Sequence, residues 1–509
     1  MIKMQAKTLM IQGTASSVGK SILVTALCRI FRQDGLSVAP FKAQNMALNS
    51  FVTKEGGEMG RAQVVQAEAA GIEPSVDMNP VLLKPEADAR SQVIIRGKVV
   101  RTISAQGYYD YTRYLLKVVE DSLNRLRSSY DLVVIEGAGS PAEINLKKRE
   151  IVNMRIAKMA HAPVLLVGDI DKGGVFASLV GTLELLEEDE RNYIKGFIIN
   201  KFRGDVRLLQ PGLELLEKRT AKPVLGVVPY FRGIAIAQED SVYLEQGVES
   251  PPSSDLDIAI IHLPHISNYD DFDPLEEEGC QVRYIAHPSE LGTPDFIILP
   301  GTKSTVSDLV YLWRSGLAEN ILQQARNGTP VVGICGGYQM LGRSLHDPDG
   351  VESAEGSVLG LGLLDVVTTF IPEKATTQVK ARVVADRGLL EGMKGQELVG
   401  YEIHMGQTKC DGDMSAFNVF ETPQGRVDYF DGTLNAQGTV LGTYLHGLFH
   451  NLDFRQTLLN SLRRDCGLPE RRGSTVTAKE KHYDKLAELV RHSLDISAIY
   501  KIVEEGINE

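Results

Sequence analysis

The stretch Met10 to Ser21, MIQGTASSVGKS, decides the fold. It begins in an apolar run, 8–11, that is typical of a buried strand, and it ends in Lys20-Ser21, where apolar residues begin to recur at helical spacing. A glycine-containing loop between a strand and a helix binds phosphate, because its backbone N–H groups turn towards the anion and the helix N-terminus adds a favourable partial charge. The stretch therefore predicts a phosphate-binding loop.

Each polar residue of this loop has a role in that prediction. Lys20 can reach the terminal phosphates of ATP, and Ser21 can ligate Mg²⁺. Five residues, rather than four, separate Gly13 from the Gly-Lys-Ser sequence, so the spacing departs from the standard pattern. An ordinary strand-to-helix turn with a surface lysine is the alternative. The predicted ATP-binding residues are Gly13, Thr14, Ser17, Gly19, Lys20, Ser21 and Asn200, the last being a candidate adenine reader at the end of a later strand.

From residue 6 to about residue 245, short apolar runs alternate with longer helical stretches such as 105–128. This alternation predicts an α/β fold with a parallel sheet covered by helices on both faces. Ligands of such sheets bind outside the carboxyl ends of the strands. The expected strands are 8–12, 37–41, 132–136, 164–168, 196–200 and 224–228.

Acidic residues stand at the carboxyl ends of two of these strands. Glu136 ends one apolar run and Asp169 follows another, with Asp171 two residues further on. Magnesium in nucleotide sites takes one or two carboxylates, so the predicted Mg²⁺ ligands are Ser21, Glu136 and Asp169. A helix cap is the alternative role for these acids, and the two aspartates can instead orient a lysine against an activated carboxylate.

Other polar stretches of the first half have less specific signals. Residues 42–50 (KAQNMALNS) and 60–71 either line a nucleotide or substrate site or form a capped loop. The basic stretch 84–101 is either a solvated face or a patch for a substrate that carries several carboxylates, with Arg90 and Arg96 as candidate substrate-binding residues.

The composition is that of a folded globular protein. The chain has 509 residues, of which 43% are hydrophobic and 24% charged, enough for roughly two to four domains. Five scattered cysteines and the lack of a secretory signal favour the cytoplasm, and no apolar run has the length of a membrane span. A net charge of −12 argues against nucleic acid as a partner, although it allows a small anionic ligand in a local basic pocket.

A second α/β unit follows a Pro- and Ser-rich linker at 247–257, with strands expected at 258–262, 281–284, 296–300 and 331–334. At its centre, in PVVGICGGYQMLG, Cys335 stands between glycines where an apolar strand runs into a helix. This pattern is typical of a nucleophile on a sharp turn. The helix N-terminus lowers the pKa of the thiol, and the N–H of Gly336 can stabilise an oxyanion. A buried structural cysteine is the alternative.

The remaining parts of a cysteine-dependent site are found on both sides of this turn. The loop at Gly301 can supply a second oxyanion N–H, and His446 in TYLHGLF is the predicted base. His404 shares a strand face with Glu402 and is expected to flank the same site. After residue 452 the chain is helical and polar, and we expect it to pack on the second unit.

Several of these motifs together resemble one family. GTASSVGKS, QNMALNS, IEGAGSPAEINL, DIDKGGVFASL, GICGGYQMLG and YLHGLF occur in the order found in the cobyric acid synthase family, and the phosphate loop is similar to that of the dethiobiotin synthetase group. The resemblance covers nearly the whole chain. It implies an ATP- and glutamine-dependent enzyme that amidates the b, d, e and g carboxylates of adenosylcobyrinic acid a,c-diamide through acyl phosphates.

The resemblance also implies the domain organisation and the partners. It divides the chain into a synthetase domain for ATP and the corrinoid (1–246), a linker (247–257), a triad-type glutamine amidotransferase domain (258–452) and a helical extension (453–509). Glutamine, Mg·ATP and the corrinoid are the implied ligands, and assembly into a homo-oligomer is left open. Cys335 attacks glutamine, and His446 protonates the departing ammonia.

One departure and three alternatives accompany this interpretation. Most triad-type amidotransferases have His-Pro-Glu, whereas Gly447 and Leu448 follow His446, so we take Glu402 as the hypothetical orienting carboxylate. Cobyrinic acid a,c-diamide synthase, which amidates only two carboxylates, is the nearest alternative; QNMALNS and DIDKGGVFAS disfavour it. A regulatory or partitioning protein with a decayed amidotransferase domain conflicts with the intact Cys335 and His446. A dethiobiotin-synthetase-like carboxylating ligase leaves 258–450 without a role.

Overall fold

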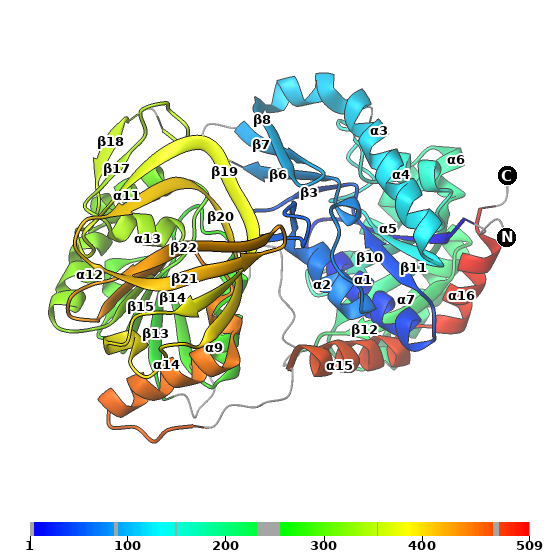
Figure 1. The fold of residues 1–509 in the computed structure, drawn as a ribbon. Coiled ribbons are helices and arrows are strands. Elements are labelled where there is room, and N and C mark those ends of the chain that lie inside the picture. The colour runs from blue at the N-terminus through cyan, green and yellow to red at the C-terminus, as the bar shows by residue number, and fades with distance from the viewer. Residues whose placement is uncertain are drawn as a thin grey trace.

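The computed structural model describes residues 5–85, 90–147, 150–231, 255–353, 355–471 and 478–507. They form two α/β halves that lie side by side, the first coloured blue to cyan and the second green to orange (Figure 1). The predicted phosphate loop connects β1 (Lys7–Gly13) to α1 (Lys20–Gln33) in the first half. Most of the predicted linker at 247–257 lies outside the described residues.

The first half is built on a six-stranded parallel sheet with the order β12-β11-β10-β1-β9-β2. The predicted parallel sheet is thus confirmed, and each of its expected strands is present with small differences at the ends. Besides β1, the strands are β2 (Val38–Phe41), β9 (Leu132–Glu136), β10 (Val164–Asp169), β11 (Ile194–Phe202) and β12 (Val224–Pro229).

Helices cover both faces of this sheet, because successive side chains of a strand point to opposite sides. On β1, Leu9 and Ile11 belong to one buried cluster, and Met10 belongs to the cluster on the other face. Such two-sided burial accounts for the continuous apolar runs in the sequence. The helices of this half are α1, α2 (Arg61–Ala70), α3 (Ala105–Ser129), α4 (Met154–Ala160), α5 (Val175–Leu185), α6 (Glu188–Arg191) and α7 (Val206–Thr220).

Between β2 and α3 the chain forms two small sheets that lie towards the second half (Figure 1). The basic stretch 84–101 lies largely in an antiparallel hairpin of this region. The four-stranded sheet contains β3 (Gln44–Met46), β6 (Val81–Pro85), β7 (Arg90–Ile95) and β8 (Lys98–Ser104), and the two-stranded one contains β4 (Ser50–Val52) and β5 (Glu58–Gly60); a short 3₁₀ helix, η1, spans Val76–Met78.

The second half contains an eleven-stranded mixed sheet. Its parallel part has the order β14-β13-β15-β16-β23 and contains the strands expected from the sequence. The antiparallel part adds long, curved strands that reach the first half (Figure 1). The strands are β13 (Asp257–Ile261), β14 (Gln281–Ile285), β15 (Phe296–Leu299), β16 (Val331–Ile334), β17 (Ser344–His346), β18 (Ser357–Leu359), β19 (Val366–Val383), β20 (Glu397–Cys410), β21 (Met414–Thr422), β22 (Gly425–Leu434) and β23 (Val440–Thr443).

Short helices complete this half. Its one long helix, α14 (Leu452–Asp465), packs its apolar face into the core of the second half, as expected. The others are η2 (Tyr269–Phe272), α9 (Asp273–Glu277), α10 (Pro288–Leu291), α11 (Thr305–Ser315), α12 (Leu317–Arg326), α13 (Gly336–Leu341), η3 (Gly388–Leu390) and η4 (Leu448–His450).

The two halves contact each other through buried polar side chains. Lys374 of β19 forms an ion pair with Glu58 of β5 at 2.5 Å, and Lys84 of β6 forms a second one with the same carboxylate at 2.6 Å. The side chain of Gln378 donates a hydrogen bond to the carbonyl oxygen of Val52 at 2.8 Å. These contacts join the long strands of the second half to the small sheets of the first.

The C-terminal helices correct one expectation. α15 (Ala478–Ser493) and α16 (Ile496–Glu505) do not pack on the second half but return to the first, beside α1 and β12 (Figure 1). Leu486, Val490 and Ile499 are buried there with residues of α1, and Arg29 of α1 forms an ion pair with Asp484 at 2.8 Å. The apolar residues of these amphipathic helices form a narrow stripe, which covers one face of the sheet. Among the described residues, none of the helices has the length and hydropathy needed to cross a bilayer.

Candidate active sites

The phosphate loop has the backbone geometry that an anion site requires. Ser17 and Gly19 both adopt positive φ, 57° and 99°, which turns the chain sharply before α1 begins. The ammonium of Lys20 contacts the carbonyl oxygens of Ala15 at 2.9 Å and Gly139 at 3.2 Å, so it is held across the mouth of the loop. A Cβ on Gly13 would lie 2.5 Å from Val18, so the tight turn excludes larger residues. Loop, lysine and helix start are therefore arranged as the sequence predicts.

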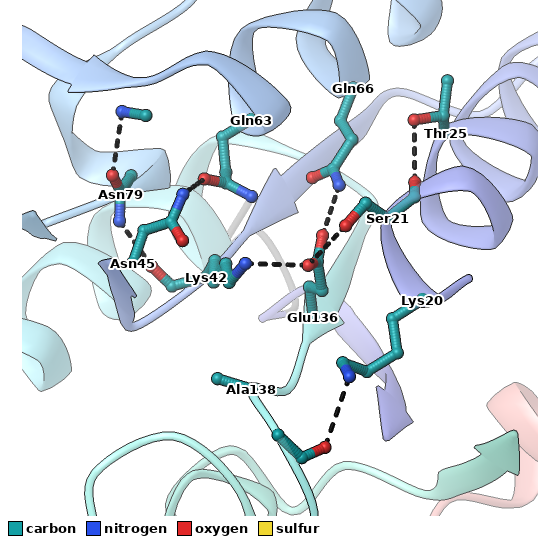
Figure 2. Close-up of polar contacts among 12 residues, drawn as sticks. Lys20, Ser21, Thr25, Lys42, Asn45, Gln63, Gln66, Asn79, Glu136 and Ala138 are labelled. Carbon is teal, nitrogen blue, oxygen red and sulfur yellow. Dashed lines mark hydrogen bonds and ion pairs between the residues drawn. The ribbon is translucent and has the colours of Figure 1, made fainter. Parts of the chain in front are cut away.

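Glu136 is the centre of a buried polar cluster beside this loop (Figure 2). Its Oε1 accepts hydrogen bonds from the hydroxyl of Ser21 and the ammonium of Lys42, both at 2.9 Å, and its Oε2 accepts one from Gln66 at 2.5 Å. Burial opposes ionisation, but the charge of Lys42 and these hydrogen bonds outweigh it and lower the pKa of Glu136. The carboxylate is thus held ionised at the end of β9, next to the start of α1.

Lys42 and Gln66 belong to the stretches 42–50 and 60–71. From the sequence alone, each of these stretches could either line a ligand site or form a capped loop. In the structure they line the cluster, and further amides stand behind them: Asn45 donates to Gln63 at 3.1 Å, while Asn79 donates to the carbonyl oxygen of Lys42 at 3.2 Å (Figure 2). These stretches therefore form one wall of the polar cluster around Glu136.

The donors of this cluster fit magnesium and a nucleotide. The carboxylate of Glu136 and the hydroxyl of Ser21 are oxygen ligands of the kind that Mg²⁺ prefers. The buried side-chain oxygen of Gln66 and the side-chain nitrogen of Gln63 have no hydrogen-bond partner among the described residues. These two groups can therefore form hydrogen bonds to a ligand. The described residues contain no cluster of three or more His, Cys, Asp or Glu side chains able to bind a metal.

The strands β10 and β11 supply the other predicted residues of this site. Asn200 donates to the carbonyl oxygen of Val18 at 2.8 Å, and a Cβ on Gly19 would lie 2.1 Å from its amide nitrogen, so Asn200 supports the loop from below. Asp169 forms an ion pair with Lys201 at 2.9 Å and accepts the backbone N–H of Asp171. Asp169 is therefore engaged with a lysine, whereas Ser21 and Glu136 are brought together directly. Thr14 continues β1 into the loop by donating its N–H to the carbonyl oxygen of Val167 at 2.9 Å.

Cys335 stands on a strained turn between β16 and α13. Its φ of 52° and ψ of −108° are rare for a residue with a side chain, and such strain is found where a nucleophile is presented. The turn is packed so closely that a Cβ on Gly337 would lie 2.0 Å from the carbonyl oxygen of Leu299. The thiol lies 3.5 Å from the carbonyl oxygen of Ile403 on β20. The expected nucleophile turn is present.

The loop after β15 lies against this turn. A Cβ on Gly301 would lie 3.0 Å from the imidazole of His446, and one on Gly336 would lie 3.2 Å from the backbone nitrogen of Thr302. The two predicted oxyanion residues are thus neighbours, with the histidine beside them. Backbone N–H groups from both loops can converge on one oxygen atom.

Asp271 orients the imidazole of His446. Its carboxylate accepts a hydrogen bond from Nδ1 at 2.6 Å and another from the N–H of Gly447 at 2.8 Å. Burial favours the neutral ring, yet the charge of Asp271 outweighs it, and with a contribution from Cys335 it raises the pKa of His446 to about 10. With Nδ1 donating to the carboxylate, Nε2 is left for the thiol.

This arrangement corrects the hypothesis that Glu402 orients His446. Glu402 accepts a hydrogen bond from the hydroxyl of Tyr429 at 2.8 Å, and burial raises its pKa to about 7. The neighbouring residue, Tyr401, instead stacks on the imidazole, with ring centroids 5.1 Å apart and planes 13° from parallel. His404 stacks on Tyr444 at 3.7 Å, and burial lowers its pKa to about 4, so it stays neutral.

Little in the sequence points to Asp271 as the orienting carboxylate. It lies 175 residues before the histidine, inside the acidic run 270–278, which has the pattern of a solvated loop. The one local indication of a functional role is that Asp271 follows the apolar strand β13. The carboxyl ends of parallel strands meet at one edge of a sheet, where ligands bind.

The basic stretch 84–101 divides between two environments. Arg90 and Arg96 are exposed, and Arg96 lies 3.3 Å from Asp77. Lys84 is buried in the ion pair with Glu58 and is therefore not part of a surface patch. The structure does not bring the two candidate arginines to either cluster described above.

Comparisons with known proteins agree with this pair of sites. Residues 9–242 match the CobQ/CobB/MinD/ParA nucleotide binding domain, and residues 257–454 match the CobB/CobQ-like glutamine amidotransferase domain. The chain is 62% identical over 502 residues to the cobyric acid synthase of Dehalococcoides mccartyi strain CBDB1, covering 99% of this chain and 100% of that one. It is 54% identical to the cobyric acid synthase of Sorangium cellulosum, covering 98% and 99% of the two chains.

Proposed function

The chain belongs to the cobyric acid synthase family, and from this premise we propose that it amidates the b, d, e and g carboxylates of adenosylcobyrinic acid a,c-diamide with ATP and glutamine. The observation that carries the proposal is the presence of two complete sites in one chain. One joins a phosphate loop to Glu136, and the other joins Cys335 to His446 and Asp271. A cobyrinic acid a,c-diamide synthase is not favoured, because the similar full-length relatives named above are cobyric acid synthases.

The synthetase reaction belongs to residues 1–246 in this proposal. A carboxylate does not condense with ammonia at neutral pH, so transfer of a phosphoryl group from ATP to the corrin carboxylate provides the leaving group. Lys20 holds the terminal phosphates, and Ser21 and Glu136 are the residues that would hold Mg²⁺, which neutralises phosphate charge when bound. Lys42 keeps Glu136 ionised, and Asn200 supports the loop through Val18 and remains the proposed adenine reader.

The glutaminase reaction belongs to residues 258–452. The Cys335 thiolate attacks the side-chain amide carbon of glutamine, and the N–H groups of Gly301 and Gly336 stabilise the oxyanion. His446 protonates the departing ammonia, then removes a proton from the water that hydrolyses the thioester to glutamate. Asp271 orients the imidazole through both steps and stabilises its protonated form. The C-terminal helices serve both halves structurally, α14 on the second half and α15 and α16 on the first.

The experiment is mass spectrometry of the corrinoid after incubation of the protein with adenosylcobyrinic acid a,c-diamide, glutamine and Mg·ATP. We expect conversion of the b, d, e and g carboxylates, loss of glutamine-dependent conversion in Cys335→Ser, and its recovery with free ammonia, because the variant removes only the nucleophile. Amidation of cobyrinic acid itself, without conversion of the a,c-diamide, would overturn the assignment. Full glutamine-dependent activity of Cys335→Ser would remove the glutaminase mechanism.

A further inference from the structure

The helix α2 reaches from the nucleotide site to the boundary with the second half of the chain. Near its middle, Gln66 donates to Oε2 of Glu136 at 2.5 Å (Figure 2). At its first residue, Arg61 forms an ion pair with Asp270 of η2 at 2.9 Å. Because a helix rises only about 1.5 Å per residue, one short and rigid element contacts both places.

The ion pair between Arg61 and Asp270 is buried. The exposed fractions of the two side chains are 6% and 4%, and both come from opposite halves of the chain. Asp270 immediately precedes Asp271, the residue that holds His446. Burial and the charge of Asp271 raise the pKa of Asp270, and the guanidinium of Arg61 is the main group that opposes this shift. Neighbouring buried carboxylates require a cation of this kind to remain ionised together.

Further hydrogen bonds tie η2 to the segment that leads into α2. The side-chain oxygen of Asn268 accepts the N–H of Ser50 at 3.0 Å, and the side-chain oxygen of Asn49 accepts the N–H of Tyr269 at 3.4 Å. The carbonyl oxygen of Asn49 in turn accepts the N–H of Arg61 at 3.3 Å. The aspartate pair behind His446 is therefore positioned from the nucleotide-binding half.

We propose that Arg61 is a positioning residue of the glutaminase and that α2 couples this site to the nucleotide site. Arg61 acts through Asp270 and Asp271 on His446, and it contacts neither glutamine nor the thiol. Near the middle of the helix, Gln66 responds to the occupancy of the Glu136 cluster, and the helix carries the displacement to Asp270. The inference rests on the proposed function, because it requires both half-reactions in one chain.

The first experiment compares glutamine hydrolysis in Arg61→Met, Arg61→Lys and the double variant Arg61→Met/Asp270→Asn. Arg29→Met is the matched control, since it removes another buried arginine side chain, whose ion pair with the half-exposed Asp484 leads to α15 rather than to His446. We expect kcat for glutamine to fall by roughly 10²-fold in Arg61→Met with little change in KM, because a small misplacement of a catalytic group has that effect. Arg61→Lys recovers part of the rate, and Arg29→Met retains it.

The double variant separates positioning from simple charge balance. It leaves no unpaired buried charge, so we expect thermal stability to return to the wild-type value. Because η2 no longer forms the ion pair with residue 61, we expect the glutaminase to stay slow. Recovery of the full glutaminase rate in the double variant would overturn the proposal, and so would an unchanged rate in Arg61→Met. Wild-type protein that fails to amidate the corrinoid with either glutamine or ammonia contradicts the proposed function instead, so the two failures are distinguishable.

The second experiment measures coupling without turnover. The rate of Cys335 alkylation by iodoacetamide is followed with and without Mg²⁺ and a non-hydrolysable ATP analogue. We expect the nucleotide to change this rate in the wild type within the roughly 5- to 150-fold range of coupled sites, and to leave it unchanged in Arg61→Met/Asp270→Asn. A nucleotide response of equal size in both proteins would show that coupling does not pass through α2, and no response in the wild type would show that it does not exist.

Discussion

At the scale of single residues, the glutaminase depends on which carboxylate meets the imidazole of His446. Asp271 accepts from Nδ1 and from the N–H of Gly447, so it fixes both the tautomer and the position of the ring. Tyr401 closes the flat side of the ring by stacking on it. Most triad-type amidotransferases orient the histidine with the glutamate of a His-Pro-Glu sequence, which is absent after His446. Here Asp271, from another loop, occupies the corresponding position against the ring.

Asp271→Asn tests this role through the titration of His446. The carboxylate raises the pKa of His446 to about 10, so the imidazolium persists through neutral pH. Without that charge, burial dominates, so we expect the titration of His446, followed by the NMR signals of its imidazole, to move to lower pH in the variant. Glutamine turnover should fall by roughly 10²-fold or more, as when a triad carboxylate is neutralised.

Glu402→Gln is the matched control, because Glu402 lies one residue from Tyr401 but bonds to Tyr429. It should leave both the titration of His446 and the glutaminase rate unchanged. An effect of Glu402→Gln equal to that of Asp271→Asn would return the orienting role to Glu402.

At the scale of elements, the sequence predicted the strands and helices that have a periodic apolar pattern. It did not predict the position of segments that are held by contacts with residues far away in the chain. The strands around the phosphate loop and around Cys335 are buried on both faces, so their apolar runs identified them. The turn 270–272 holding Asp271 carries no such periodicity, because its position is set by contacts with 49–61. The helices 478–505 were expected on the wrong half, since an amphipathic stripe does not indicate which surface it covers.

The docking of α15 can be tested with Leu486→Ala. Leu486 is fully buried with residues of α1, the helix that starts at the phosphate loop. We expect the free energy of unfolding to fall by about 2–5 kcal/mol, as for other buried leucines, together with weaker ATP binding. Leu208→Ala is the control, because 83% of the Leu208 side chain is exposed. Equal unfolding curves for the two variants, measured in urea, would show that α15 does not contribute to the nucleotide half.

At the scale of the whole molecule, the chain returns to its first half after building the second. The C-terminal helices pack on both halves, α14 on the second and α15 and α16 on the first (Figure 1). The halves are also joined by the buried contacts around η2, β5 and β19. Such an arrangement keeps the glutaminase next to the wall of the nucleotide site formed by α2. It also concentrates buried charge at the boundary, where the single carboxylate of Glu58 pairs with both Lys84 and Lys374.

Glu58→Gln tests whether this boundary is held by that charge balance. The variant leaves two ammonium groups buried without a counter-ion, so we expect stability at pH 7 to fall by about 3–5 kcal/mol, the usual effect of breaking a buried ion pair. Burial lowers the pKa of Lys374 to about 8 in the native protein even with Glu58 present. Between this value and the ordinary lysine pKa of 10.5 the unfolded chain binds more protons, so stability contributed by this group rises with pH.

In Glu58→Gln the lysine loses its proton at still lower pH, so the stability deficit relative to the wild type should shrink from pH 7 to pH 9. Urea unfolding at both values measures this change. The control is Glu421→Gln, which breaks the exposed ion pair between Glu421 and Lys380 and should have no measurable effect at either pH. A deficit that is constant with pH would mean that the boundary is stabilised by packing alone, and that Glu58 is not the counter-ion on which the contact between the halves depends.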